Sequence, residues 1–279
     1  MSKFTGHYCN EKVDSIKKIF ISKRKEFLKL NLTAALNWEK YFLMSVSHHS
    51  TAIEGSSLTP SESQLLLDEG ITPKGKPFEH SQMEKDHYEA FQFIVQEAKN
   101  KVKVTPEFIR RVAAKVMHGT GKEYNVPAGR FDSSRGEYRK IGVFTGETSY
   151  PNFMKVEGMA ESLCNQLERK INEVKTVSAI HDLAFDFHFD LVSIHPFADG
   201  NGRVSRLMMN YILVYHGEIP AIIHKEDRNE YIEALKKSRK IKSTEPIRYF
   251  LYAQQVKFFQ KQIEDHRSGG KDIYLSFLA

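Results

Sequence analysis

The feature that most constrains the fold is a pair of apolar patterns on either side of a short glycine-rich loop. Before the loop, apolar residues recur at steps of three and four, at Ile180, Leu183, Ala184, Phe187, Leu191 and Ile194. This spacing places them on one face of a helix that leads directly into His195. After the loop, residues 207–214 are apolar at almost every position, which is typical of a helix buried on most sides.

The rest of the chain repeats the helical period. We predict helices at 13–53 (two, divided near Asn31), 60–69, 81–98, 105–117, 153–174, 231–240 and 246–265. Thr59, Pro60 and Glu62 form a capping box with a first-turn proline, and Gly70 closes that helix. Glycines and a proline interrupt the pattern at 119–129. We expect only residues 136–151 to be extended, as a short hairpin or flap. The predicted fold class is all-α with a small β-hairpin flap.

Composition narrows the class of protein. Lysine and arginine exceed the acidic residues by 41 to 35, which gives a net charge of +6, but the lysines are scattered and form no block. A solvated surface explains them better than a nucleic-acid face, so we expect no nucleic-acid partner. Cys9 and Cys164 share no metal-ligand spacing and predict neither a disulfide nor a zinc site. No stretch has the length of a membrane span, and we expect a cytoplasmic protein without a membrane partner.

The loop itself carries groups suited to binding phosphate. Gly200, Asn201 and Gly202 can turn the backbone so that successive N–H groups form an anion-binding nest. The helix that follows would point its N-terminus at this nest, and helix N-termini favour phosphate. Arg203 and Arg206 lie one helical turn apart and can both reach a polyphosphate.

Two further residues of the loop supply reactive chemistry. Asp199 is a hard oxygen ligand of the kind that Mg²⁺ takes together with substrate phosphates. His195 can accept a proton near neutral pH. A base, a metal ligand, a phosphate cradle and a cationic clamp together predict phosphoryl-type transfer from a nucleotide.

These residues match the signature HxFx(D/E)GNGRxxR, and the chain therefore resembles the Fic-domain nucleotidyltransferases. The fixed positions are His195, Phe197, Asp199, Gly200, Asn201, Gly202, Arg203 and Arg206. The resemblance extends over most of 105–253. Most members of that family transfer AMP from ATP to a Ser, Thr or Tyr hydroxyl of a target protein with Mg²⁺, so the resemblance implies ATP as substrate and Mg²⁺ as cofactor.

The resemblance also implies a role for each motif residue. His195 would be the general base that deprotonates the target hydroxyl, and Asp199 would hold Mg²⁺ between the α- and β-phosphates. Arg203 and Arg206 would neutralise the β- and γ-phosphates. The backbone of residues 200–202 would cradle phosphate oxygens, and Phe197 would anchor the loop in the core.

Outside the loop, the resemblance extends to the flap and to a tyrosine. The flap at 136–151 would pair with an extended segment of the target protein. Within it, the residues that would border the nucleotide are Val143, Phe144, Thr145 and Gly146. Tyr231 matches a family tyrosine near the adenine pocket. Relatives often have an asparagine eight residues later, where this chain has Arg239.

An inhibitory motif is implied near the N-terminus. Residues 50–55 fit the pattern [ST]xxxE[GN] through Ser50, Glu54 and Gly55. By this likeness, Glu54 would pair with Arg206 and occupy the place of the γ-phosphate. We therefore expect an autoinhibited protein adenylyltransferase. Removal of AMP, another nucleotide or phosphate transfer at the same site, automodification and a homodimer stay open.

We expect three regions in the chain. Residues 1–104 would form an N-terminal helical region with the inhibitory motif. Residues 105–253 would form the Fic catalytic core. Residues 254–279 would hold the end of the last helix and a flexible tail.

Two functions of other classes remain as alternatives. His181 and Asp182 form a dyad, with Asp186, His188 and Asp190 nearby, which would suit a metal-dependent phosphohydrolase. The same residues also make an ordinary polar face of an amphipathic helix, and we favour that reading. A binding module with a degenerate Fic site is the other alternative, but the motif has no degenerate position.

Overall fold

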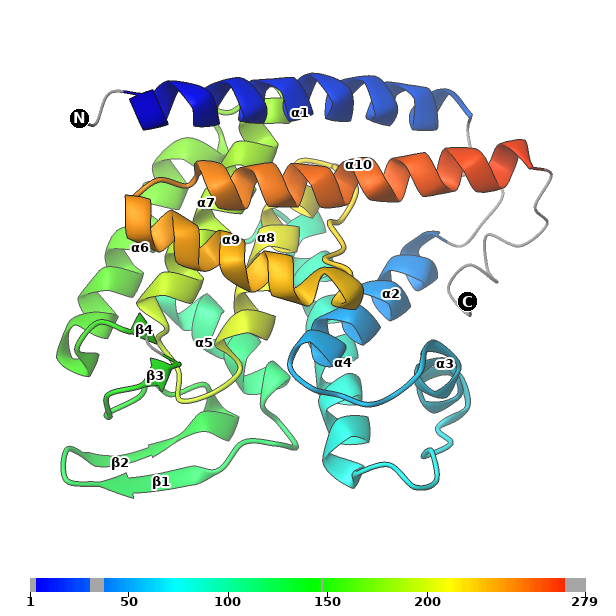
Figure 1. The fold of residues 1–279 in the computed structure, drawn as a ribbon. Coiled ribbons are helices and arrows are strands. Elements are labelled where there is room, and N and C mark those ends of the chain that lie inside the picture. The colour runs from blue at the N-terminus through cyan, green and yellow to red at the C-terminus, as the bar shows by residue number, and fades with distance from the viewer. Residues whose placement is uncertain (1–3, 31–37, 147, 269–279) are drawn as a thin grey trace.

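The computed structural model describes residues 4–30, 38–146 and 148–268, and this part of the chain is mainly helical (Figure 1). The helices are α1 Phe4–Lys29, α2 Trp38–Ile53, α3 Pro60–Glu69, α4 Phe78–Lys99, α5 Pro106–Val116, α6 Val156–Ile171, α7 Val177–Ile194, α8 Asn201–Tyr215, α9 Arg228–Ile241 and α10 Glu245–Arg267. The predicted all-α class is confirmed. The expected helix division near Asn31 and the tail after Ser268 lie outside the described residues.

The hydrophobic core is centred on α8, as its sequence predicts. Val204, Leu207, Met208 and Ile212 of this helix are completely buried. Helices α4, α5 and α7 pack against α8, while α1 lies along α10 on an outer layer (Figure 1). Because α7 and α8 are joined only by residues 195–200, their packing holds the intervening loop at the edge of the core.

Helix ends with local signals in the sequence are found where they are predicted. The Thr59 hydroxyl accepts a hydrogen bond from the Glu62 amide at 3.2 Å, and the Glu62 carboxylate accepts one from the Thr59 amide at 2.8 Å. Gly70 ends α3 with φ of 72°. The Thr105 hydroxyl likewise caps α5 by accepting from the Phe108 amide. These bonds join near neighbours, so the sequence alone can encode them.

The prediction that residues 136–151 form the only extended segment is wrong. A first antiparallel hairpin pairs β1 (Glu123–Val126) with β2 (Gly129–Asp132), and the flap contains a second, with β3 (Phe144–Thr145) and β4 (Thr148–Ser149). In the first hairpin, the rings of Tyr124 and Phe131 stack across the strands at 4.7 Å. Pro127 and Ala128 form its turn, and Gly129, which seems only to interrupt helical periodicity, begins β2 with φ of 106°.

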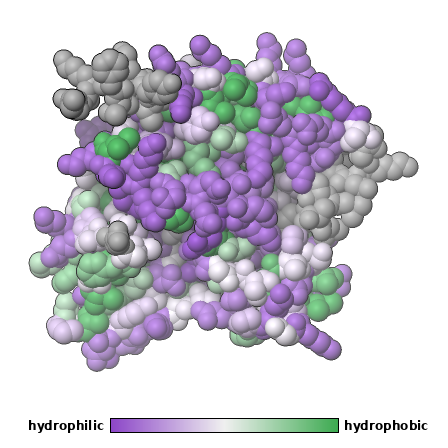
Figure 2. Space-filling model, in the orientation of Figure 1, coloured by the Kyte–Doolittle hydropathy of each residue, from purple (hydrophilic) through white to green (hydrophobic). Residues whose placement is uncertain are grey.

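The surface is polar where the outer helices face solvent. Figure 2 shows hydrophilic residues over the face on which α9 and α10 lie in Figure 1. Two large apolar side chains are well exposed in and just after the flap, Phe144 at 72 % and Met154 at 75 %. Within the described ranges, no helix is both long enough and apolar enough to cross a membrane.

Candidate active site

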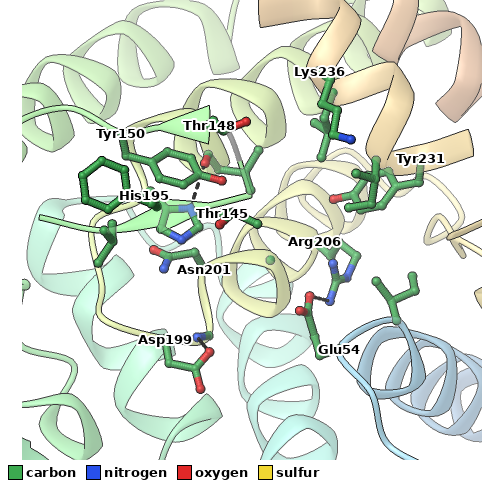
Figure 3. Close-up of a pocket in the computed structure, with 18 of the residues that line it drawn as sticks. Glu54, Thr145, Thr148, Tyr150, His195, Asp199, Asn201, Arg206, Tyr231 and Lys236 are labelled. Atoms are coloured by element: carbon green, nitrogen blue, oxygen red, sulfur yellow. Dashed lines mark hydrogen bonds and ion pairs between the residues drawn. The ribbon is translucent and has the colours of Figure 1, made fainter. Parts of the chain in front are cut away.

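A cavity of about 370 Å³ opens between the flap, the α7–α8 loop, the end of α2 and one face of α9. Its volume lies within the range of sites for small molecules, roughly 300–1,000 Å³. His195, Asp199 and Arg206 line it together with Glu54 and Tyr231, as Figure 3 shows. The structure therefore brings residues that are far apart in the sequence to one place.

His195 occupies the C-terminal cap of α7 in the left-handed region, with φ of 53° and ψ of 59°. Its Nδ1 lies 3.2 Å from the Val192 carbonyl oxygen. A carbonyl can only accept, so Nδ1 carries the hydrogen and Nε2 is left with a free lone pair. Burial lowers the pKa of His195 to about 4, and the cationic Arg139 and Arg239 act in the same direction. The imidazole is therefore neutral near pH 7, as a general base must be.

The loop after His195 is held by the side chain of Asn201. Its amide nitrogen donates to the Phe197 carbonyl, and its amide oxygen accepts from the Phe197 N–H, both at 2.9 Å. Phe197 itself is 2 % exposed, in agreement with its predicted anchoring role. Asn201 and Gly202, which the sequence assigns to the loop, already belong to α8, and Gly200 caps this helix with φ of 79°. The cavity thus meets a helix N-terminus directly, a favourable place for phosphate.

Arg203 and Arg206 contact different groups. Arg203 is 3 % exposed and faces α5, with a terminal nitrogen 3.2 Å from the Met117 sulfur and 3.6 Å from the Asp199 carboxylate. Its Nε and other terminal nitrogen have no hydrogen-bond partner within the described parts of the chain. The sequence predicts a clamp on one side, but packing against Met117 turns Arg203 away from the cavity wall. Its two free donors fit an anion at the adjoining helix N-terminus.

Asp199 presents its carboxylate to solvent at the mouth of the cavity. The side chain is 66 % exposed, and its Oδ1 accepts from the Gly200 amide at 2.5 Å. No cluster of three or more His, Cys, Asp or Glu side chains suited to a metal occurs among the described residues. A single accessible carboxylate fits Mg²⁺ that is held jointly with substrate phosphates, because this ion commonly binds through one or two carboxylates.

Glu54 and Arg206 form an ion pair inside the cavity. A terminal nitrogen of Arg206 lies 2.7 Å from Glu54 Oε1, and Arg206 also donates to the hydroxyl and the carbonyl of Ser50, both at 2.9 Å. Arg206 is 4 % exposed, whereas the Glu54 side chain is 36 % exposed toward the opening. Burial alone would raise the pKa of Glu54, but Arg206 holds it below its ordinary value, with help from Arg203. Glu54 is therefore ionised near pH 7.

The turn that carries Glu54 ends α2 in the predicted way. Gly55 follows with φ of 105°, and its amide donates to the Ala52 carbonyl. The sequence predicts Ser50, Glu54 and Gly55 as one motif, and the structure places the first two on Arg206 while Gly55 turns the chain.

The flap and Tyr231 complete the wall of the cavity. Val143, Phe144 and Thr145 line it, whereas Gly146 lies in the hairpin turn with φ of 57° and does not. Tyr231 is 1 % exposed, and its hydroxyl lies 2.8 Å from His188 Nε2. Its ring therefore forms a fixed wall beside Arg206.

The sequence-based set of nucleotide-site residues omits several residues of the cavity wall, among them Tyr150, Arg228, Lys236 and Arg239. Arg228 lies three residues before Tyr231, and Arg239 lies eight residues after it. Helical periodicity counted from Tyr231 would have identified both as lying on its face of α9. Tyr150 has no such signal, because it lies in an irregular segment after β4.

In the alternative His181–Asp182 dyad, both side chains make packing and ion-pair contacts within the fold. His181 is 2 % exposed, and its ring packs between Phe20 and Phe185. Asp182 pairs with Lys17 at 2.6 Å and accepts from the Tyr252 hydroxyl. Both side chains also contact Tyr252, and neither lines the cavity described above.

Comparisons with known proteins agree with this geometry. Residues 103–213 match the model of the Fic/DOC family. Over 192 residues, the chain is 30 % identical to protein adenylyltransferase Fic of Drosophila erecta, a match that covers 68 % of this chain and 36 % of that relative. The same protein of Drosophila melanogaster gives the same identity and coverage. The match thus spans about a third of the length of these relatives.

Solved structures extend the likeness over nearly the whole fold. A Fic-domain signaling protein from Bacteroides thetaiotaomicron has a TM-score of 0.72 at 23 % identity, covering 92 % of this chain and 97 % of that one. Fic-1 (residues 134–508) from C. elegans has a TM-score of 0.73 at 20 % identity, covering 94 % and 74 %. Because the signature loop, the family model and the fold agree, the chain contains a domain of the Fic/DOC family at residues 103–213.

Proposed function

We propose that this chain is an autoinhibited protein adenylyltransferase that moves AMP from ATP to a Ser, Thr or Tyr hydroxyl of a target protein, with Mg²⁺. The observation that carries the proposal is the convergence of His195, the N-terminus of α8 and the Glu54–Arg206 pair on one cavity. The name of the Drosophila erecta relative supports adenylyl transfer as the reaction.

The chemistry assigns one task to each group. Neutral His195 takes the hydroxyl proton at Nε2, while the hydroxyl oxygen forms a bond to the α-phosphorus of ATP. The bond from that phosphorus to the β-phosphate bridging oxygen breaks, and pyrophosphate leaves. Asp199 would hold Mg²⁺, which supplies neutralisation of phosphate charge when bound, and the helix N-terminus with Arg203 and Arg206 would bind the departing phosphates.

Autoinhibition would follow from the ion pair that Glu54 forms with Arg206. Among the described residues, the carboxylate that Arg206 contacts is that of Glu54, 2.7 Å away. A γ-phosphate that needs Arg206 would also meet the negative charge of Glu54 at close range. Displacement of α2 or loss of this carboxylate would release Arg206 for ATP.

The flap is the proposed docking site for the target protein. Phe144 in β3 is 72 % exposed and borders the cavity, so an extended segment that pairs with residues 136–151 would run close to His195. Automodification and a homodimer belong to the same proposal, because a second copy of the chain can offer its own hydroxyls to the flap.

The first test compares wild type, Glu54→Gly and Glu54→Gly/His195→Ala with α-labelled and γ-labelled ATP and Mg²⁺. We expect Glu54→Gly to place more α-label on protein than wild type, because Arg206 is released. The double variant should lose roughly 10²–10⁴-fold of that rate, the usual contribution of a positioned base. Equal labelling by wild type and Glu54→Gly would refute autoinhibition, and retained γ-label would indicate phosphorylation instead.

Removal of AMP is a second candidate because the Glu54 carboxylate opens to the cavity and can orient a water molecule. Protein labelled by Glu54→Gly, freed of nucleotide, provides the substrate. Wild type should release AMP from it with Mg²⁺, whereas Glu54→Gln should not. Release at the same rate by both would exclude Glu54 from this reaction.

A further inference from the structure

The base of the proposed reaction is covered by an aromatic ring from the flap. The ring centroids of Tyr150 and His195 are 3.8 Å apart, and their planes meet at only 19°, so the two rings stack face to face. Figure 3 shows Tyr150 directly against His195 at the cavity wall. The guanidinium of Arg239 lies 5.5 Å from the centroid of the same Tyr150 ring. The tyrosine is thus held between the imidazole and a cation from α9.

The segment that carries Tyr150 is itself tied to the backbone of His195. Arg139 is 1 % exposed and donates to three carbonyl oxygens: His195 at 2.7 Å, Ile141 at 2.7 Å and Pro151 at 2.6 Å. The Arg139 amide also donates to the Pro196 carbonyl at 3.0 Å. One buried guanidinium therefore joins both ends of the flap to the catalytic loop.

We infer that Tyr150 is a positioning residue for His195, held in register by Arg139; this inference rests on the proposed function, in which His195 is the general base. The only hydrogen bond of the imidazole to a described residue is from Nδ1 to the Val192 carbonyl, which leaves the ring free to rock about that contact. The stacked tyrosine restrains the plane of the ring and covers one of its faces. Nε2 then points toward the cavity as a proton acceptor.

This arrangement also connects target binding with the base. Tyr150 follows β4 (Thr148–Ser149) directly, so the flap strand and the stacking ring belong to one short segment. A target segment that pairs with the flap would therefore contact the same segment that holds the Tyr150 ring on His195. A misplacement of about 1 Å can cost ~10²-fold in rate, so the stack has a measurable effect on turnover.

The test uses the Glu54→Gly background with Tyr150→Phe, Tyr150→Ala and the control Tyr249→Ala. Tyr249 is an exposed tyrosine of α10 outside the cavity, so its loss tests for a general effect of removing a ring. We expect Tyr150→Ala to lower kcat on the order of tenfold or more with little change in the KM for ATP. Tyr150→Phe keeps the stacked ring and should rescue kcat, and the control should match the background.

A pH profile separates positioning from a loss of folding. The charged groups around His195 are Arg139 from the flap, Arg239 from α9 and Glu54 from the turn after α2. Removing the covering ring hydrates the imidazole, so the acid limb of the rate profile should shift from near pH 4 toward pH 6.5 in Tyr150→Ala. Unchanged kcat and an unchanged acid limb in Tyr150→Ala would overturn the inference, as would a Tyr150→Phe variant as impaired as Tyr150→Ala.

The titration of the imidazole, followed by NMR, tests the inference without any activity. The His195 signals are identified by their absence in His195→Ala. A rise of the His195 pKa in Tyr150→Ala, but not in Tyr150→Phe, supports the stack even if no label transfer is found. Transfer that survives His195→Ala would instead refute the proposed function while leaving this structural result intact.

Discussion

Gly202 illustrates how the absence of one side chain lets distant segments meet. A Cβ at this position would lie 2.3 Å from Glu54 Oε1 and 2.9 Å from a terminal nitrogen of Arg206. Any larger residue would therefore push the Glu54 carboxylate away from Arg206. The second glycine of the signature loop makes room for Glu54 at rest, and by the proposed function it makes room for phosphate in the active state.

Gly136 predicts a stability effect at the residue scale. It adopts φ of 64°, and an added Cβ would lie 2.0 Å from the Arg110 carbonyl oxygen and 2.9 Å from the Ala114 amide nitrogen. These are backbone atoms of α5 and cannot swing aside. We expect Gly136→Ala to destabilise the fold by more than the ~1–2 kcal/mol cost of a left-handed alanine, measured by denaturant unfolding.

The matched control is Gly217→Ala. Gly217 has φ of 73° and no atom within 4 Å of its added Cβ, so this variant reports the backbone strain alone. If both variants lower the free energy of unfolding by the same amount, close packing at Gly136 contributes nothing to stability.

At the scale of elements, α2 is held by buried polar contacts as well as by the Glu54–Arg206 pair. The Thr51 hydroxyl donates to the Glu84 carboxylate of α4, and His48 Nδ1 lies 2.9 Å from the Ser63 hydroxyl of α3. On the other side, His48 Nε2 lies 3.2 Å from the Lys225 ammonium. These contacts set the rotation of α2 about its axis, which aims Glu54 at Arg206.

The buried carboxyl group of Glu84 leads us to predict that the stability of the fold around α2 and α4 depends on pH. Its side chain is fully buried, and burial raises its pKa to about 7. A raised pKa means that stability is greatest below the unfolded value of about 4.5 and is lost as the pH rises through 7. Glu84→Gln removes this dependence while it keeps an acceptor for Thr51. We therefore expect the Tm of Glu84→Gln, relative to wild type, to increase from pH 5 to pH 8.

The control for Glu84 is the exposed carboxylate of Glu233. Its side chain is 70 % exposed, so Glu233→Gln should follow wild type at every pH. A constant Tm difference between Glu84→Gln and wild type from pH 5 to pH 8 would show that Glu84 is already ionised in the fold.

At the scale of the whole molecule, the fold encloses many histidines in neutral form. Burial lowers the pKa of His48, His181 and His195 to about 4 and that of His188 to about 3. They are distributed over α2, α7 and the loop after α7. Protonation of any of them in the folded state would place a charge in or next to the core, so acid acts on the entire fold and not on one helix.

This distribution predicts a loss of stability in mild acid. A depressed pKa means that the contribution of each histidine is fully present above about 6.5 and is lost as the pH falls toward 4. Glu84 and Asp190, with pKa values raised to about 7 and about 6, act in the opposite sense. The histidines with lowered pKa values, which also include His49 and His87, outnumber the carboxyl groups with raised ones. We expect Tm to fall from pH 6.5 to pH 4 and unfolding at pH 5 to take up protons, measured by calorimetry in two buffers.

Two histidine variants make the acid prediction specific. His181→Phe replaces a buried ring among Phe20 and Phe185, and it should flatten the decline of Tm with acid. His118 is 79 % exposed, so His118→Ala should leave the decline unchanged. A Tm that rises on acidification to pH 5, or a release of protons on unfolding, would contradict the sign.

Local signals explain which parts of the fold could be predicted. The ends of α3 and α5 depend on Thr59 and Thr105 bonding to amides three residues away, and the apolar repeats of α7 and α8 are properties of each helix alone. The hairpin at 123–132 was missed because its stability depends on Tyr124 stacking on Phe131 across the strands. The proposed three-part division of the chain stays a prediction.

The chemistry of residues 195–206 can be predicted from the sequence because the reactive groups lie next to one another in the chain. Only packing determines which of them face the cavity. Met117, directly after α5, contacts Arg203, and the side chain of Asn201 bonds to the backbone of Phe197. Packing also placed Tyr150 on His195 and Glu54, 152 positions away, on Arg206. Periodicity and motif spacing encode short-range relations, whereas such contacts depend on how whole helices rotate and pack against one another.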